Sequence, residues 1–436
     1  MCQSMTQEEI EAGKGVLLSG WGEMVDLVVS HGKGALFWDI EDKEYIDCTS
    51  QAWSLNTGFN HPRVINAVRE QLDKVTHIRS TFYSLPQLQL AKKLSEIAPG
   101  EGSKKLKRVS FCLHGSVATE GAMKIALKSK GGGQFLALFN GYHGRTLGSM
   151  SVSWPHPNNE FLSCMGNTIR VPAAYCYRCS FNLEYPKCNL QCANFIEEAI
   201  EKMPDGKICA LIMEPIQGNG GQIIFPPEFH TRMRQICDKF GILLIYDEVQ
   251  TAFGRVPAMF CCQLYNIIPD IIIYGKALGG GFPIAGTLSR EGLAKFSTGD
   301  HGFTFGHSPM SLVAALENLN VIEEENLLER SKSLGDYIFT ELNQMKEKYE
   351  LIGDVRGCGL MIGVELVKDR KTREPARKEA QDFVNEALKR GVLFGTSRYA
   401  GLGNVVKIKP PVVITDKQVD RVLEVFEEVL KMISEK

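Results

Sequence analysis

Apolar runs of strand length recur along the chain, and each of them ends in polar or glycine residues. Such runs occupy residues 108–113, 135–140, 208–213, 241–246 and 269–274. Their β-branched and aromatic content predicts buried strands. Residues 64–72 and 87–97 instead carry apolar side chains at helical spacing, and a long helix of small residues is predicted from Met310. The pattern is typical of an open α/β sheet, in which ligands bind beyond the carboxyl ends of the strands.

One of these strands leads to a lysine in an unusual setting. The run at 269–274 is followed by Lys276, which lies among Gly275, Gly279, Gly280 and Gly281. A lysine at the mouth of a buried strand is costly unless its pKa is lowered and its amine is used. Such amines form Schiff bases with carbonyls, above all with pyridoxal phosphate. The alternative is an ordinary surface loop after a core strand.

A carboxylate stands at the end of a second strand. The run at 241–246 is followed directly by Asp247. The pyridoxal ring acts as an electron sink when its nitrogen is protonated, and a buried Asp beside that nitrogen keeps it charged. A lone Asp at a strand end is more commonly a helix N-cap. The pairing of Asp247 with Lys276 favours the cofactor site.

The residues around both positions resemble the signature of one enzyme family. Residues 247–250 read Asp-Glu-Val-Gln, residues 254–255 read Gly-Arg, and residues 275–283 read Gly-Lys-Ala-Leu-Gly-Gly-Gly-Phe-Pro. This is similar to the class III pyridoxal-phosphate aminotransferases, the ornithine and 4-aminobutyrate aminotransferase family. The resemblance implies fold type I, with a mainly parallel seven-stranded sheet flanked by helices and a smaller α+β domain built from both termini. It places an N-terminal segment at 1–60, the large cofactor domain at 61–325 and the small domain at 326–436.

The phosphate end of the cofactor is expected where residues 108–113 run into a helix. A strand, a Gly-Ser turn and a helix present free N–H groups to an anion, although a helix capped by Ser116 would look the same. His114, Val117 and Thr119 depart from the family pattern, whereas Gly115, Ser116 and Glu120 keep it. The resemblance implies that Thr304 reaches the phosphate of the neighbouring subunit, and hence a homodimer or a dimer of dimers. The full set of cofactor-binding residues expected is Gly115, Ser116, Val117, Tyr142, His143, Glu214, Asp247, Val249, Gln250, Lys276 and Thr304.

The substrate is expected to meet Arg145, Glu214 and Lys407. In the family, the residues that match Arg145 and Glu214 bind a remote carboxylate and gate the α-carboxylate pocket. The arginine that commonly precedes Pro-Pro and holds the α-carboxylate is replaced here by Lys407. Lysine is a point charge without the bidentate fork of arginine, which favours an ω-amine donor over an α-amino acid.

Four of the thirteen cysteines lie close together, at 176, 179, 188 and 192. Two close pairs are compatible with a metal site. Their spacing is irregular and no His accompanies them, so a packed, reduced loop is the favoured interpretation and no metal is predicted.

Charge and composition limit the classes of partner and the compartment that we expect for this protein. The formal net charge of −2 gives no reason to expect nucleic acid or an anionic membrane. Neither a membrane-length apolar run nor a signal-peptide pattern is present, and the scattered cysteines fit a reducing compartment, so a cytoplasmic protein is predicted.

The expected reaction is ping-pong transamination from an amine, such as 4-aminobutyrate, β-alanine, a diamine or a thioester-carried β-amino acid. A keto acid such as 2-oxoglutarate or pyruvate would accept the amino group. An amino-acid epimerase or a dialkylglycine-type decarboxylase of the same family remains an alternative. A non-catalytic, cofactor-binding relative is disfavoured by the presence of both Lys276 and Asp247.

Overall fold

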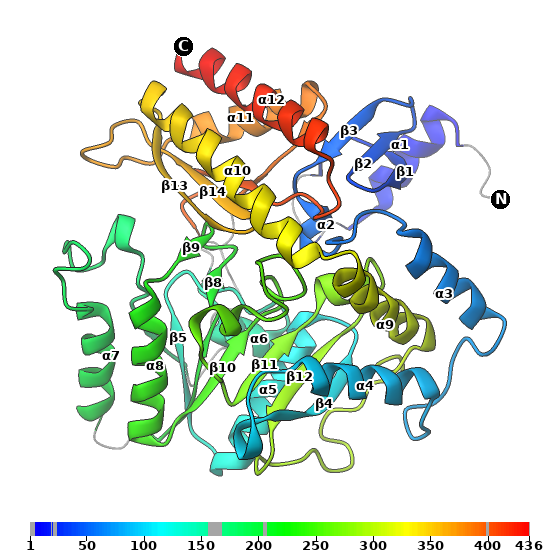
Figure 1. The fold of residues 1–436 in the computed structure, drawn as a ribbon, viewed down its shortest axis with the longest axis vertical. Coiled ribbons are helices and arrows are strands. Elements are labelled where there is room, and N and C mark those ends of the chain that lie inside the picture. The colour runs from blue at the N-terminus through cyan, green and yellow to red at the C-terminus, as the bar shows by residue number, and fades with distance from the viewer. Residues whose placement is uncertain are drawn as a thin grey trace.

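The computed structural model describes residues 5–18, 20, 24–155, 168–203, 207–397 and 401–435. Its centre is a seven-stranded sheet with the strand order β4-β12-β11-β10-β7-β5-β6 (Figure 1). All neighbours from β11 to β6 are parallel, whereas β12 runs antiparallel to both β11 and β4. The predicted mainly parallel sheet is therefore confirmed. Its strands are β4 (Leu106–Cys112), β5 (Gln134–Leu138), β6 (Thr168–Val171), β7 (Ile208–Met213), β10 (Leu243–Asp247), β11 (Ile271–Tyr274) and β12 (Ala285–Arg290).

Helices cover both faces of this sheet because its strands are apolar on both sides. One face packs against α5 (Gly115–Lys130) and α6 (Leu147–Val152). The other face packs against α4 (Leu85–Ile97), α7 (Gln191–Glu201), α8 (Pro227–Phe240) and α9 (Pro309–Glu324). In the middle strand, Leu243 and Ile245 belong to the first core and Leu244 and Tyr246 to the second. This alternation is the period of two that a strand imposes on its side chains.

The C-terminal part forms a second layer above the carboxyl ends of the large sheet (Figure 1). Its sheet has the order β13-β14-β17-β16. Three helices pack against this sheet, α10 (Leu327–Lys348), α11 (Arg377–Lys389) and α12 (Asp416–Ser434). The buried side chains of α12 extend from Val419 to Ile433. The strands are β13 (Ile352–Cys358), β14 (Met361–Leu366), β16 (Gly395–Thr396) and β17 (Val405–Ile408).

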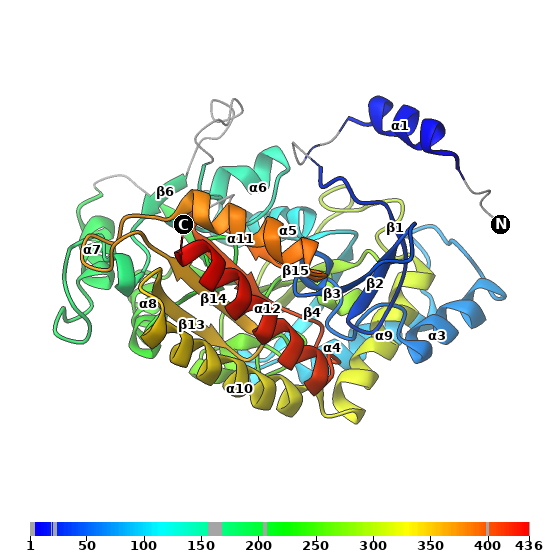
Figure 2. The same ribbon diagram turned by 90° about the horizontal axis from the view of Figure 1, so that it is seen from above.

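The N-terminal segment joins the C-terminal part through a shared sheet. The strand order there is β1-β2-β3-β15, with Ile46 and Asp47 of β3 parallel to Val392 and Leu393. In Figure 2 the N-terminal helix α1 (Gln7–Val16) stands away from the body, and none of its residues is buried. The strands are β1 (Val29–Lys33), β2 (Leu36–Asp39), β3 (Glu44–Asp47) and β15 (Val392–Leu393).

The remaining elements are one longer helix, which packs against α9, and several short segments. They are α2 (Ser50–Trp53), α3 (Pro62–Leu72), η1 (Gly102–Lys104), η3 (Cys176–Arg178), β8 (Ile216–Gln217), β9 (Ile223–Ile224), η4 (Cys261–Tyr265) and η5 (Lys276–Gly279). No helix of the described residues is long and apolar enough to cross a membrane.

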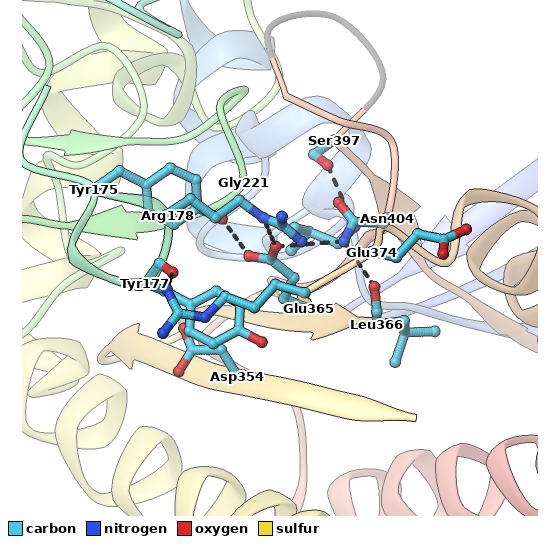
Figure 3. A network of polar contacts seen from close by, with 12 residues as sticks. Tyr175, Tyr177, Arg178, Gly221, Asp354, Glu365, Leu366, Glu374, Ser397 and Asn404 are labelled. Atoms are coloured by element: carbon cyan, nitrogen blue, oxygen red, sulfur yellow. Dashed lines mark hydrogen bonds and ion pairs between the residues drawn. The ribbon is translucent and has the colours of Figure 1, made fainter. Parts of the chain in front are cut away.

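A buried polar network ties the two layers together (Figure 3). Arg356 on β13 donates to the Glu365 carboxylate at 2.8 Å and to the carbonyl of Gly221 at 2.8 and 3.0 Å. Tyr175 and Arg178 reach the same carboxylate from the cysteine-containing loop. Because Glu365 lies on β14, which pairs with the strand that carries Lys407, the network helps to fix that lysine above the large sheet.

Replacing the central guanidinium should therefore loosen the contact between the layers. We expect Arg356→Met to destabilise the fold by about 3 kcal/mol, because Glu365 loses a buried charged partner. Thermal unfolding checks this, with Arg421→Met as the matched control. Arg421 pairs with Glu424 and Glu428 on an exposed helix face, where an ion pair contributes about 1 kcal/mol or less. Equal unfolding midpoints for the two variants would contradict the role of the network.

Candidate active site

Three predicted residues meet at the carboxyl ends of three neighbouring strands. Glu214 follows β7, Asp247 ends β10 and Lys276 follows β11, and these strands are adjacent in the sheet. All three line one cavity of about 920 Å³. The cavity lies beyond the carboxyl ends of these strands, the edge of the sheet at which open α/β sheets bind ligands.

Lys276 reaches the cavity from a constrained turn. Its backbone is left-handed, with φ of 45°, and the following three residues complete η5. A side chain at the preceding Gly275 would press on Ala285, with 3.0 Å between the two Cβ atoms. Burial lowers the pKa of the Lys276 amine to about 8, although Asp247 and Glu214 nearby act in the opposite direction. The amine is thus available in its neutral, nucleophilic form near physiological pH.

Asp247 is anchored by a histidine. The carboxylate is 4% exposed, and its Oδ2 lies 2.8 Å from Nδ1 of His143, whose side chain is fully buried. The N–H of Val249 donates to the other oxygen at 3.1 Å. His143 is itself fixed by its backbone contacts to Ser153 and Thr119. The acid is consequently held in one orientation toward the cavity.

Glu214 is fixed by the backbone. Its two carboxylate oxygens accept from the N–H groups of Tyr142 and Gly218, both at 2.9 Å. Burial raises the pKa of Glu214 to about 7. The carboxyl group can therefore change its protonation state near neutral pH as the charge of its surroundings changes.

The predicted phosphate cradle is an open helix N-terminus. Helix α5 begins at Gly115, and its N-cap is His114, so Ser116 lies inside the helix and is not the cap. The Ser116 hydroxyl accepts from the backbone N–H of Arg145 at 3.0 Å. A side chain at Gly115 would approach Val249 to 3.1 Å, so the turn is closely packed. Gly115, Ser116 and Val249 line the cavity, whereas Val117 does not.

Gln250 offers an unpaired polar atom to the same cavity. Its side chain is 6% exposed and its Oε1 has no hydrogen-bond partner among the described residues. A buried orphaned polar atom in a cavity is a position that a ligand can satisfy. The helix N-terminus, the orphaned Gln250, the acid at 247 and the amine at 276 fit the phosphate, the ring substituents and the aldehyde of pyridoxal phosphate.

Gly218, the first residue of the turn at 218–221, leaves the space that the Gln250 side chain occupies. A Cβ on Gly218 would lie 1.8 Å from Gln250 Oε1. We expect Gly218→Ala to displace Gln250 and to weaken cofactor binding by about tenfold, the loss of one good polar contact. Titration of the apoenzyme with pyridoxal phosphate measures this. Gly15→Ala on the exposed helix α1 is the control, because nothing lies within 4 Å of the added Cβ; equal affinities for both variants would contradict the prediction.

Tyr142 and Arg145 form one wall. Both line the cavity, and Arg145 Nε donates to the Tyr142 hydroxyl at 3.1 Å. The guanidinium is exposed and also lies over the Tyr142 ring, 5.9 Å from its centroid. The pair thus presents an aromatic face to the cavity and a cation at its entrance.

Lys407 also lines the cavity, together with Trp53 and Lys409, two residues that the sequence motifs did not indicate. Lys407 is 2% exposed, and its amine lies 4.9 Å from the centroid of the Trp53 ring. Lys409 lies 3.1 Å from the same centroid and lines the same cavity. The strand period of two could have placed Lys409 beside Lys407. No local sequence signal points to Trp53.

Thr304 lies apart from the site of its own chain. It is exposed in the loop before α9 and is absent from the lining of the cavity. Cys176, Cys179, Cys188 and Cys192 surround a separate, much smaller cavity together with Tyr175 and Pro226. Among the residues that the structure describes, no group of three or more His, Cys, Asp or Glu side chains is arranged to hold a metal ion.

Comparison with known proteins agrees with this geometry. The family model of class-III aminotransferases matches residues 18–430. A leucine/methionine racemase from Thermococcus litoralis is 37% identical over 94% of this chain and 91% of its own length. An acetylornithine aminotransferase from Methanosarcina mazei is 37% identical over 92% of this chain and 91% of its own length. The crystal structure of an amine transaminase from an uncultivated Pseudomonas species, in its PLP-bound form, superposes with a TM-score of 0.87 at 30% identity, over 96% of this chain and 99% of that one.

The fold and the arrangement of lysine, acid and helix N-terminus define a pyridoxal-phosphate-dependent enzyme of fold type I. Within that class the chain belongs to the class III aminotransferase family, and it is a pyridoxal-phosphate-dependent transaminase.

Proposed function

We propose that this enzyme moves the amino group of an ω-amine, or of a β- or γ-amino acid, to a keto acid such as 2-oxoglutarate or pyruvate. The observation that supports this best is the convergence of Lys276 and Asp247 from adjacent strands on one cavity. When bound, pyridoxal phosphate supplies an electron sink that makes the carbon next to the substrate nitrogen acidic.

In this proposal Lys276 would hold the cofactor and would also carry a proton to and from the substrate carbon, for which a pKa of about 8 is suitable. Asp247, oriented by His143, pairs with the ring nitrogen. Tyr142 and Gln250 both line the cavity; Tyr142 would lie against the cofactor ring, and Gln250 would contact its phenolic oxygen. Gly115 and Ser116 take the phosphate, and Val249 packs against their turn.

The proposed preference for the donor rests on three charged residues of the cavity, Arg145, Lys407 and Glu214. Arg145 at the entrance suits a carboxylate remote from the reacting amine. Lys407 lacks the fork that clamps an α-carboxylate, and Glu214 can neutralise the pocket when the donor carries no charge there. These features favour an amine that is distant from its acid group.

The pKa of Lys276 predicts how fast the apoenzyme takes up its cofactor covalently. Because only the neutral amine attacks the aldehyde, the uptake rate should rise about tenfold per pH unit below pH 8 and level off above it. Stopped-flow absorbance on apoenzyme measures this profile. A rate that continues to rise up to pH 10 would show that burial does not lower the pKa of the Lys276 amine to about 8.

The relative that racemises leucine and methionine supports a second candidate, an amino-acid racemase. The two reactions differ in their products. With donor alone, a transaminase converts its bound cofactor to the amine form and releases a keto or aldehyde product. A racemase returns both enantiomers of the donor and leaves the cofactor unchanged.

A screen of amines with the holoenzyme decides between them. We expect ω-amines and ω-amino acids to bleach the visible band of the bound cofactor stoichiometrically, and a keto acid to restore it. Chiral chromatography of L-leucine, L-methionine and L-alanine after incubation should show no D-enantiomer. Racemisation without bleaching would overturn the proposal in favour of the second candidate.

We also propose that the enzyme works as a homodimer or a dimer of dimers. The exposed position of Thr304 outside its own cavity suits a residue that completes the site of a partner. Helix α1, with no buried residue, and the exposed Phe82, Tyr83 and Phe305 offer apolar surface for such an interface. We further propose that the chain is divided into an N-terminal segment that ends at residue 60, a large domain that ends at residue 325 and a small C-terminal domain. We also propose a cytoplasmic location.

A further inference from the structure

Three lysines converge on one indole ring inside the cavity. The amines of Lys276, Lys407 and Lys409 lie 5.3, 4.9 and 3.1 Å from the centroid of Trp53. Lys407 and Lys409 are only 2% and 1% exposed. No ion pair or hydrogen bond of these three amines occurs within the described part of the chain, and the indole Nε1 is buried without a partner.

Trp53 is held in place by strained backbone. Residues 50–53 all have positive φ, between 43° and 69°, although none of them is glycine. A left-handed turn of L-residues costs free energy and persists only where its surroundings impose it. The Asp47 carboxylate imposes it here by accepting from the backbone N–H groups of Thr49 and Gln51, at 2.7 and 3.0 Å. The Ser50 hydroxyl donates to the carbonyl of Lys409 and accepts from Arg255, both at 2.7 Å. The turn is thereby bonded to the backbone of Lys409, directly after β17.

The acids nearby do not neutralise this cluster. Asp47, whose charge favours the protonated form of Lys409, accepts hydrogen bonds from the backbone of the turn with its carboxylate oxygens. Glu214, whose charge favours the protonated forms of Lys407 and Lys276, accepts from two backbone N–H groups. Asp247 also acts on Lys276 and is paired with His143. Lys407, Lys276 and Arg255 instead repel Lys409. Once Lys276 is engaged with the cofactor, Lys407 and Lys409 remain as two buried amines with lowered pKa values, which a bound anion can bridge and hold in their protonated form.

We propose that Lys407, Lys409 and the Trp53 Nε1–H form a subsite for a donor, or a product, whose acid end is a tetrahedral dianion, such as a phosphonate or phosphate monoester. This proposal rests on the proposed transaminase function and specifies its substrate class. Lysines suit such a group because they bind phosphate as point charges, whereas a single carboxylate matches the arginine fork. Both amines lie within 5 Å of one ring centroid, so they can reach a single small group together. The dianion stabilises the protonated form of both amines, which burial and their mutual repulsion otherwise disfavour.

Binding of unreactive anions tests this on the cofactor-saturated holoenzyme. The probes are ethylphosphonate, ethanesulfonate and propionate, which share a two-carbon chain and differ in charge and shape. We expect ethylphosphonate at pH 8 to bind at least about tenfold more tightly than ethanesulfonate, which has the same shape and one charge fewer. Burial lowers the pKa of Lys407 to about 7 and that of Lys409 further, so binding should take up protons. Calorimetry in two buffers of different ionisation enthalpy measures that uptake.

Variants locate the effect. Lys409→Gln and Lys409→Met should reduce the phosphonate preference to about one, while Lys371→Gln, an exposed lysine that lines no part of the cavity, should keep it. Equal affinity for phosphonate and sulfonate in the wild-type enzyme, or an unchanged preference in both Lys409 variants, overturns the proposal. Because the probes carry no amine, their binding does not depend on amino transfer. An enzyme that selects the phosphonate and yet fails to bleach with any amine would refute only the transaminase function.

Discussion

Lys276→Ala should lower kcat by about 10⁴-fold or more. The substitution removes both the covalent attachment of the cofactor and the amine proposed to move the proton at the substrate carbon, and each role alone contributes about 10²–10⁴-fold. The variant should still bind pyridoxal phosphate, because Asp247, Gln250 and the N-terminus of α5 remain. Steady-state turnover with an ω-amine and a keto acid measures the loss.

Two observations make this result specific to the amine. Borohydride should attach the cofactor to the peptide that contains residue 276 in the wild-type protein and to no peptide of the variant, as mass spectrometry will show. Lys371→Ala removes an exposed lysine and should leave kcat unchanged. A Lys276→Ala enzyme with more than about a hundredth of normal activity would argue that another amine performs the proton transfer.

Asp247→Asn should lower kcat by about 10²–10³-fold, the cost of removing a preorganised charge from the reacting group. The amide keeps the shape of the carboxylate but cannot stabilise a protonated ring nitrogen. It also faces His143 Nδ1 at a distance of 2.8 Å, so one of the two side chains must reorient to keep the contact. Cofactor affinity should fall less than kcat, because the phosphate contacts are unchanged. Turnover and apoenzyme titration separate the two effects.

Asp369→Asn is a matched control, since Asp369 lies outside the cavity, exposed in a turn that it caps through Thr372. It should preserve turnover. A further comparison with His143→Gln tests the orienting role, because that variant keeps the acid and loses its anchor. We expect it to retain more activity than Asp247→Asn; the reverse order would mean that His143, and not the acid, is the group that matters to the ring.

The main elements of the large sheet were predictable from local pattern. Residues 208–213, 241–246 and 269–274 became three adjacent strands because buried parallel strands read as continuous apolar runs. Glu214, Asp247 and Lys276 follow these runs directly, and parallel strands bring their carboxyl ends to one edge. For this reason three short motifs were enough to predict that these side chains come together at one cavity.

The phosphate end was predicted less completely. Gly115 and Ser116 line the cavity as expected, but Val117 points elsewhere, and the cap of α5 is His114. Helix boundaries depend on contacts of the first turn with other segments, here with Val249 and Arg145, and local sequence does not contain these contacts.

The amino-acid sequence by itself determined the strands, their polar ends, and the positions of Lys276 and Asp247 just beyond them, since each of these depends on neighbours a few residues away. Only the tertiary structure brought Trp53 over Lys407 and Lys409, which lie more than 350 positions further along the chain, and set His143 against Asp247 across 104 positions. A contact between distant segments is specified by the packing of the whole fold, and so is the lowered pKa of Lys407, whose main cause is burial.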